Sequence, residues 1–175
     1  EGNVNVTFDD ADDSTLSTIG VTAGKWYCEF KITNEATGKA TVGVGNESSN
    51  LVINPGSNNI GGHGGDYGYY ANGQKAINGA TLASYGDSFT TNDIIGIALD
   101  LTNGAIWFSK NGTWQASATI SEIEAGTTTN ACATGLSGTF FFGCSNSASG
   151  TTGDAFSVNF GNPTFTGTDQ SDGNS

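Results

Sequence analysis

Two Asn-Gly dipeptides, Asn103-Gly104 and Asn111-Gly112, constrain the fold of this chain more than any other feature. An Asn-Gly pair between extended segments is the strongest short-range signal for a β-hairpin, because both central residues of a type I′ turn need positive φ, which Asn and Gly tolerate. An alternating apolar segment separates the two dipeptides. The sequence therefore predicts a three-strand meander, with strands over 93–101 and 105–110 and a third that begins at Thr113.

Alternation of side chains shows which face of each strand meets the core. Residues two apart share a face of a strand. In the second strand of the meander, Trp107 points away from the face that holds Ile106 and Phe108. The same period of two recurs elsewhere in the chain, which predicts further strands over 3–8, 24–33, 39–45, 139–145 and 155–161.

The composition supports an all-β chain. Hydrophobic residues make up 35% of it, 27 residues are Gly and only 2 are Pro. No segment keeps a helical period, and about ten short strands with tight turns are typical of a two-sheet antiparallel β-sandwich. We expect one domain over 1–161, followed by an irregular tail over 162–175 that continues in a longer natural protein.

Charge and hydropathy narrow the range of partners. The 17 acidic and 5 basic side chains give a formal net charge of −12. Such a chain repels a nucleic-acid backbone, so no nucleic-acid partner is expected. The acidic excess is explained by solubility alone, with a specific cationic partner as the alternative. No apolar run is long enough to span a bilayer, and no membrane insertion is expected.

The three cysteines do not form a recognisable framework. Their number is odd and no two of them form a CxxC pair. Cys28 and Cys144 alternate with large apolar residues, as buried structural thiols do, whereas Cys132 lies in a Thr- and Ala-rich loop and is not placed by the pattern. One disulfide is left open.

Five segments, taken in order, resemble the SPRY family. They cover residues 24–32, 42–45, 67–80, 93–114 and 156–161, within a match that extends roughly from Leu16 to Gly161. The resemblance implies a bent sandwich of the concanavalin-like, jelly-roll kind. The segment 17–27 is more narrowly similar to SPRY-like domains in structural proteins of tailed, especially marine, bacteriophages. Cys28 stands where many members of the family carry an aromatic residue.

Catalytic or metal chemistry finds little support in the sequence. His63 is the only imidazole, and no nucleophile motif surrounds it. Glu122 and Glu124 have the spacing of paired carboxylates, but no aromatic platform lies near them in the sequence, so solvated charge is the favoured interpretation. A cluster of aspartates lacks the spacing of a calcium loop and is interpreted as a solvated turn; it comprises Asp9, Asp10, Asp12 and Asp13. We predict no catalytic residue, no metal site and no cofactor.

Recognition is the remaining role. A long loop over 46–70 and the hairpin after it supply flat aromatic faces with polar edges, which sugar and peptide binding use. About half of this set is expected to be core instead, because side chains alternate in a strand. For both Trp107 and Trp114, ligand binding and packing against neighbouring residues are left as alternatives. The predicted ligand-binding residues are Asp66, Tyr67, Tyr69, Tyr70, Asn72, Trp107 and Trp114.

The resemblance to phage SPRY-like domains, together with these features, implies a non-enzymatic recognition or decoration module on a virion surface, outside the cell. It would belong to a fibre or to a capsid or tail decoration, and it would bind a host glycan, a host protein or a neighbouring virion subunit, with homo-oligomerisation within a fibre left open. One alternative is an intracellular SPRY-type adaptor that binds a peptide. Another is a carbohydrate-active enzyme of concanavalin-like fold.

Overall fold

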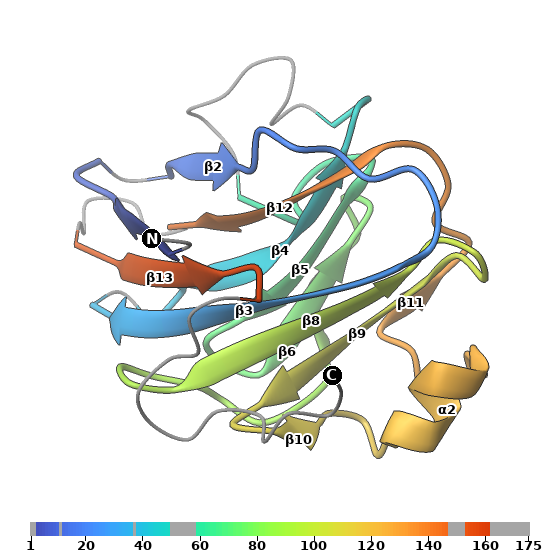
Figure 1. Cartoon of the computed structure of the whole chain (residues 1–175). Helices are drawn as coiled ribbons and strands as arrows, with labels where there is room; N and C mark the ends of the chain where they lie inside the picture. The colour runs from blue at the N-terminus through green and yellow to red at the C-terminus, as the bar shows by residue number, and fades with distance from the viewer. Residues whose placement is uncertain (1–2, 11, 37, 50–58, 147–152, 162–175) are drawn as a thin grey trace.

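Two antiparallel β-sheets face each other in the computed structural model, which describes residues 3–10, 12–36, 38–49, 59–146 and 153–161 (Figure 1). They enclose one main hydrophobic core, so the predicted all-β two-sheet sandwich is confirmed. The predicted tail over 162–175 lies outside the described residues. The described part of the chain contains no helix with the length and apolar character needed to cross a membrane.

The first sheet has seven strands. Strand β1 forms one edge, and it pairs with β13 so that Asn3 lies opposite Asn159. The first and last described strands are therefore neighbours. Along the sheet the strands are β1 (Asn3–Thr7), β13 (Ala155–Asn159), β3 (Lys25–Asn34), β8 (Ile94–Asp100), β9 (Ala105–Lys110) and β10 (Thr113–Trp114), and β11 (Ala133–Thr134) also pairs with β9.

The second sheet has six strands. Its edge strand β2 has three residues and pairs with β12, where Leu16 lies opposite Gly143. The central strands carry the predicted hairpin around Asn72-Gly73. The order is β2 (Ser14–Leu16), β12 (Phe140–Ser145), β4 (Thr41–Asn46), β5 (Asp66–Tyr70), β6 (Gln74–Ile77) and β7 (Ala83–Ser84).

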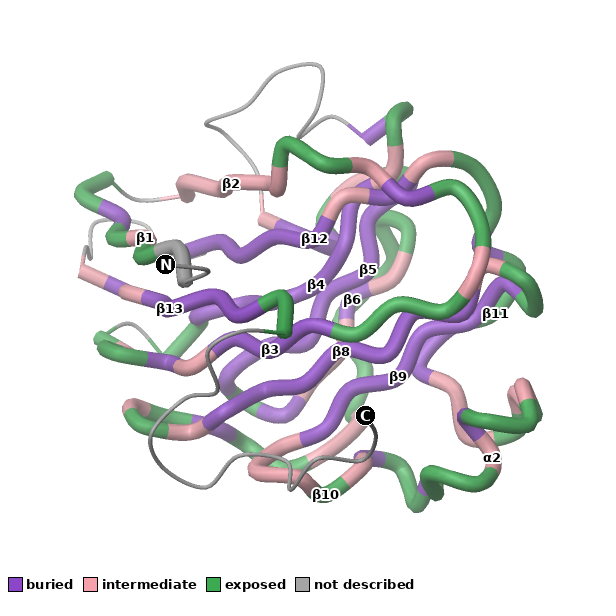
Figure 2. The backbone as a smooth tube through the Cα atoms, in the orientation of Figure 1, coloured by how far each residue is buried: buried purple, intermediate pink, exposed green. Residues whose placement is uncertain are grey.

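The core lies between the inner faces of the two sheets. Figure 2 shows the central strands as buried and most of the connections as exposed. The predicted alternation holds in the meander, because Ile97 and Leu99 of β8 and Phe108 of β9 all join the main core. Cys28 and Cys144 are buried there as predicted, Cys132 is buried as well, and all three thiols are free.

The predicted meander forms from β8, β9 and β10. Its second turn is the expected tight one, because Asn111 and Gly112 both take positive φ, at 47° and 80°. The first connection is longer: in residues 101–104 only Gly104 takes positive φ, at 65°. Asp100 organises that connection, since its Oδ1 accepts the backbone N–H groups of Thr102 at 2.9 Å and Asn103 at 3.0 Å.

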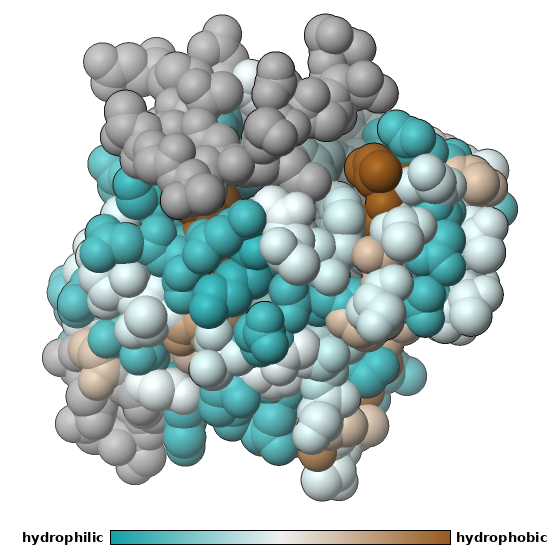
Figure 3. Space-filling view, turned by 90° about the horizontal axis from the view of Figure 1, so that it is seen from below, coloured by the Kyte–Doolittle hydropathy of each residue, from teal (hydrophilic) through white to brown (hydrophobic). Residues whose placement is uncertain are grey.

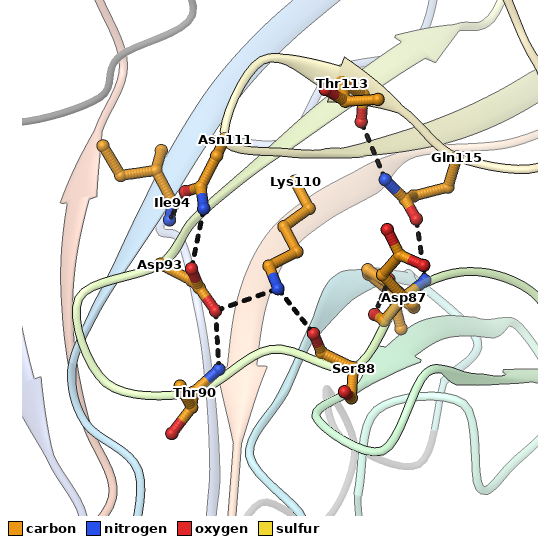
Figure 4. Close-up of polar contacts among 10 residues, drawn as sticks. Asp87, Ser88, Thr90, Asp93, Ile94, Lys110, Asn111, Thr113 and Gln115 are labelled. Carbon is orange, nitrogen blue, oxygen red and sulfur yellow. Dashed lines mark hydrogen bonds and ion pairs between the residues drawn. The ribbon is translucent and has the colours of Figure 1, made fainter.

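Polar side chains hold the end of the meander at the β9–β10 turn against neighbouring residues (Figure 4). Lys110 Nζ lies 3.3 Å from Asp93 Oδ2 and donates to the Ser88 carbonyl at 2.7 Å. Gln115 Nε2 donates to the Thr113 carbonyl at 2.8 Å, and Gln115 Oε1 accepts the backbone N–H of Asp87 at 2.8 Å. These contacts attach β9 and β10 to the connection that precedes β8.

A short helix, α2 (Ile120–Ala125), covers part of the outer face of the first sheet, although no segment of the sequence keeps a helical period. Thr119 and Glu122 form a capping box at its start, and Gly126 ends it with φ 70°. Beneath it lies a second small core, formed by Ala98, Ala105, Trp107, Ala118 and Ile123. Trp107 thus points away from the main core, as the alternation predicts.

Candidate functional site

The structure buries five of the seven predicted ligand-binding residues. Asp66, Tyr67, Tyr69 and Tyr70 belong to β5, every residue of which is buried, and Trp107 lies under α2 with no exposed surface. Asn72 is exposed in the turn after β5, and Trp114 is partly exposed in β10. The seven residues do not gather at one surface, and their role in binding stays a prediction.

Tyr69 shows why these rings are core residues. Its ring packs against Phe89, Phe108 and Tyr85, with centroid separations of 5.3 to 5.5 Å. Its hydroxyl donates to the carbonyl of Asp87. A large apolar ring with a satisfied polar tip suits an interior position.

Asp66 forms a buried polar site with His63. The carboxylate has no exposed surface, and His63 Nδ1 lies 4.0 Å from its Oδ2. Burial raises the pKa of Asp66 to about 6, against the opposing effects of a hydrogen bond from Ser49 and of the nearby His63. The pair belongs to the turn that enters β5, and it provides no nucleophile.

The two carboxylates with paired spacing, Glu122 and Glu124, both belong to helix α2. Glu122 accepts the backbone N–H of Thr119 at 2.8 Å and the side-chain amide of Asn130 at 3.0 Å, and these bonds lower its pKa. Glu124 is exposed on α2. Among the residues that the structure describes, no group of three or more His, Cys, Asp and Glu side chains is placed to hold a metal ion.

An apolar groove between the two sheets is the strongest candidate for a functional site. Its volume is about 480 Å³. Buried side chains from both sheets form its floor: Val21, Phe30, Phe142 and Val158. Side chains that solvent reaches form its rim: Ile19, Trp26, Tyr27 and Phe160, which are 75%, 47%, 42% and 49% exposed.

The groove gathers most of the large hydrophobic side chains that the described surface exposes. Six such residues are exposed, and the only two outside the groove are Leu82 and Ile120. The face seen in Figure 3 carries hydrophobic residues only as small separate patches among hydrophilic ones. Since soluble proteins rarely gather exposed apolar side chains without a use for them, the groove is a candidate binding surface.

Edge strands explain why the groove is open. Strand β1 ends the first sheet and β2 ends the second, and Val6 of β1 and Leu16 of β2 both line the groove. Strand β2 pairs over only three residues, and after it the chain turns through residues 17–20 before Val21 bridges to Phe140. The two sheets therefore separate at this side, and neither covers the floor completely.

Two of the rim residues share a strand face with core residues. Trp26 lies on the same face as Cys28, and Phe160 on the same face as Val158, yet both are about half exposed. Trp26 stands near the beginning of β3 and Phe160 just beyond the end of β13, where the opposite sheet no longer covers them. The position of an apolar residue at a strand end is the sequence signal that could have identified them.

The chemistry of the groove suits binding. Among the described residues, its lining includes no Asp, Glu, Lys or His, and its residues with polar side-chain groups are Thr15, Ser17, Thr18, Trp26 and Tyr27. The Tyr27 hydroxyl donates to Glu29 Oε1 at 2.8 Å, and burial raises the pKa of Tyr27, with Glu29 adding to the rise. An apolar cleft with a few polar groups is typical of a ligand site.

Comparison with known proteins identifies relatives of the chain. The model of a family described as SPRY domain matches residues 25–162. ATP-dependent RNA helicase DDX1 of Xenopus laevis is 35% identical over 96 residues, which are 55% of this chain and 12% of the helicase. Ddx1 of Drosophila melanogaster is 35% identical over 97 residues, with the same two shares. The chain thus matches only 12% of the length of these curated relatives.

Solved structures show the same architecture. The SPRY domain of human HERC1 has a TM-score of 0.62 at 20% identity, and the match covers 89% of this chain and 88% of that one. A second human SPRY domain has a TM-score of 0.63 at 14% identity, and the match covers 91% of this chain and 96% of that one. At these identities the likeness concerns the fold alone.

Proposed function

The chain belongs to the SPRY family, and from this premise we propose that it is a protein-binding module whose apolar groove receives side chains of a partner protein. One observation carries the proposal: four of the six exposed large hydrophobic side chains surround this groove. Trp and Tyr are among the residues that most often dominate binding energy at interfaces. The proposed activity is binding without catalysis.

The named relatives support a SPRY-type peptide-binding adaptor more than a virion module. The helicases come from a frog and a fly, and the named solved domains are human. None of these is a phage protein. A place on a virion surface remains a hypothesis that rests on composition and on the segment 17–27. Fibre or capsid sequence beside this domain in the full reading frame would favour the virion, and a zinc-binding or helical adaptor segment would favour the adaptor.

A selection from displayed random peptides tests the groove. Peptides enriched on the wild-type protein are synthesised with a fluorescent label, and their affinities are measured by anisotropy. Trp26→Ala and Phe160→Ala are expected to weaken binding about tenfold or more, because truncation of an anchoring aromatic costs roughly 1–2 kcal/mol or more.

Leu82→Ala provides the matched control. Leu82 is 41% exposed, close to the values for Trp26 and Phe160, but it does not line the groove. Its truncation is expected to leave the affinities unchanged. Equal binding by the wild type and both groove variants would refute the groove as the binding surface.

A further inference from the structure

The connection that leads into the groove-lining strand β2 carries a concentration of negative charge. The connection between β1 and β2 contains Asp9, Asp10, Asp12 and Asp13, which we call the acidic turn. It joins the edge strands β1 and β2 (Figure 1). Val6 lies shortly before it in the chain and Thr15 shortly after it, and both line the groove. The acidic turn therefore lies next to an apolar site.

Positive charge is scarce around this site. The chain has no Arg, and its five basic residues are all lysines. None of the lysines lines the groove. Three are engaged elsewhere: Lys25 donates to the Ile123 carbonyl at 3.1 Å, Lys75 donates to the Cys132 carbonyl at 2.6 Å, and Lys110 lies 3.3 Å from Asp93. An apolar groove and an acidic turn thus adjoin at the start of the edge strand β2.

The outer edge of β2 adds a backbone surface. Strand β2 ends its sheet, and no strand among the described residues pairs with its outer side. An extended peptide can add to such an edge through main-chain hydrogen bonds, while its alternate side chains enter pockets. The groove lies beside this edge, since Thr15 and Leu16 of β2 line it.

From these three features we infer that the groove receives an extended peptide segment of a partner protein that carries alternating apolar side chains followed by Lys or Arg. This inference rests on the proposed function. The apolar side chains fill the space between the rim residues Trp26 and Phe160, and the basic end lies against the acidic turn. Charge then selects among partners with similar apolar side chains, because complementary charge contributes to specificity and to the rate of association.

The test selects random peptides on the wild-type protein and, in parallel, on one double variant. Wild-type protein is expected to enrich alternating apolar positions together with Lys or Arg. The double variant Asp12→Asn and Asp13→Asn is expected to enrich the apolar pattern alone. Labelled wild-type-selected peptides should bind the double variant about three- to tenfold more weakly, since each exposed ion pair contributes roughly 0.2–1 kcal/mol. Their affinity for the wild type should also fall with added salt.

The outcomes distinguish the inferred basic peptide from the proposed function, which is protein binding by the groove. Apolar enrichment without a basic preference, or equal affinity for the aspartate variant, overturns the basic partner and leaves the groove as a binding site. Binding that Trp26→Ala does not weaken overturns the proposed function itself. A protein that sediments as a dimer through this face overturns the inference in favour of a second copy. Peptide binding that appears only in a chain ending at Gly161 would instead show that the chain's own residues 162–175 fill the groove.

Discussion

The side-chain amide of Asn111 donates a hydrogen bond of 2.7 Å to Asp93 Oδ1, so the turn that ends β9 is tied to the residue that precedes β8. The other side of the same amide accepts the backbone N–H of Ile94 at 2.8 Å. Asp93 in turn accepts from Thr90 and lies against Lys110. Asn111 therefore serves as a turn residue with positive φ and also as a clamp across the hairpin (Figure 4).

Asn111→Ala is expected to lower the free energy of unfolding by about 2–3 kcal/mol. Two hydrogen bonds are lost at about 1 kcal/mol each, and alanine is less favourable than asparagine at positive φ. Urea denaturation measures the loss. Asn111→Gly removes the same hydrogen bonds without the backbone strain, so it should cost less. If both variants cost the same, backbone conformation does not contribute at this turn.

Tyr69→Ala should destabilise the protein by about 3–5 kcal/mol, the usual cost of truncating a buried aromatic. Tyr69 has no exposed surface and packs against three other rings. Tyr69→Phe removes only the hydroxyl that donates to Asp87 and should cost about 1 kcal/mol. Chemical denaturation of both variants gives the comparison. A Tyr69→Ala protein as stable as the wild type would contradict a core role.

Strand patterns were the reliable part of the prediction from sequence. The period of two identified the meander and the burial of Cys28, and the double positive φ at Asn111-Gly112 followed from turn chemistry. Helix α2 was missed because a helix of six residues is too short to show a period. Its signal is local: Thr119 and Glu122 have the spacing of a capping box.

The candidate site was harder to predict than the fold. The alternation of side chains tells which face of a strand a residue occupies, but it does not tell where the opposite sheet ends. Tyr69 and Trp26 are both aromatic residues in strands with an alternating side-chain pattern. Tyr69 nevertheless lies in the centre of the sandwich, whereas Trp26 lies at its open side. That difference depends on the lengths of β1 and β2 and on how the two sheets diverge, which a single strand pattern does not contain.

Thr119→Ala should fray α2, because the Thr119 hydroxyl accepts the backbone N–H of Glu122 in the capping box. Loss of such a cap costs about 1 kcal/mol. Hydrogen exchange of amides in 120–126 should accelerate about fivefold, while exchange in β8 should change little. Thr119→Ser keeps the hydroxyl and serves as the control. Equal acceleration in the Ser and Ala variants would argue against the cap.

Asp66 should make stability fall as the pH rises from about 4 to about 6. Its pKa is about 6 in the folded protein, against 3.8 as the ordinary value. Between these values the unfolded chain has lost the proton that the folded protein keeps, so ionisation favours unfolding; above pH 6 the penalty is constant. Asp66→Asn removes this dependence, and denaturation at a series of pH values measures the difference between the two proteins.

The difference between Asp66→Asn and the wild type should therefore grow from pH 4 to pH 6 and then level off. His63→Gln serves as a second variant. Because His63 opposes the rise in the Asp66 pKa, its removal should extend the fall in stability to higher pH. A difference between Asp66→Asn and the wild type that does not change with pH would show that Asp66 titrates normally.

Tryptophan fluorescence should distinguish the groove from the interior. The chain has three Trp residues, of which Trp26 is 47% exposed, Trp107 is fully buried and Trp114 is intermediate. Trp26→Phe should therefore remove the red-shifted emission that acrylamide quenches most strongly. Trp107→Phe should remove blue-shifted emission that is weakly quenched. The difference spectra between the wild type and each variant isolate the two indoles.

The same pair of indoles reports occupancy of the groove. A peptide selected on the wild type should protect Trp26 from acrylamide, because its apolar side chains would exclude water from the rim, and it should leave Trp107 unaffected since α2 covers that ring. The Trp26→Phe protein should then show no protection by the peptide. If Trp26 resists quenching in the free protein, the groove is already covered in solution, and a partner would have to displace whatever covers it before binding.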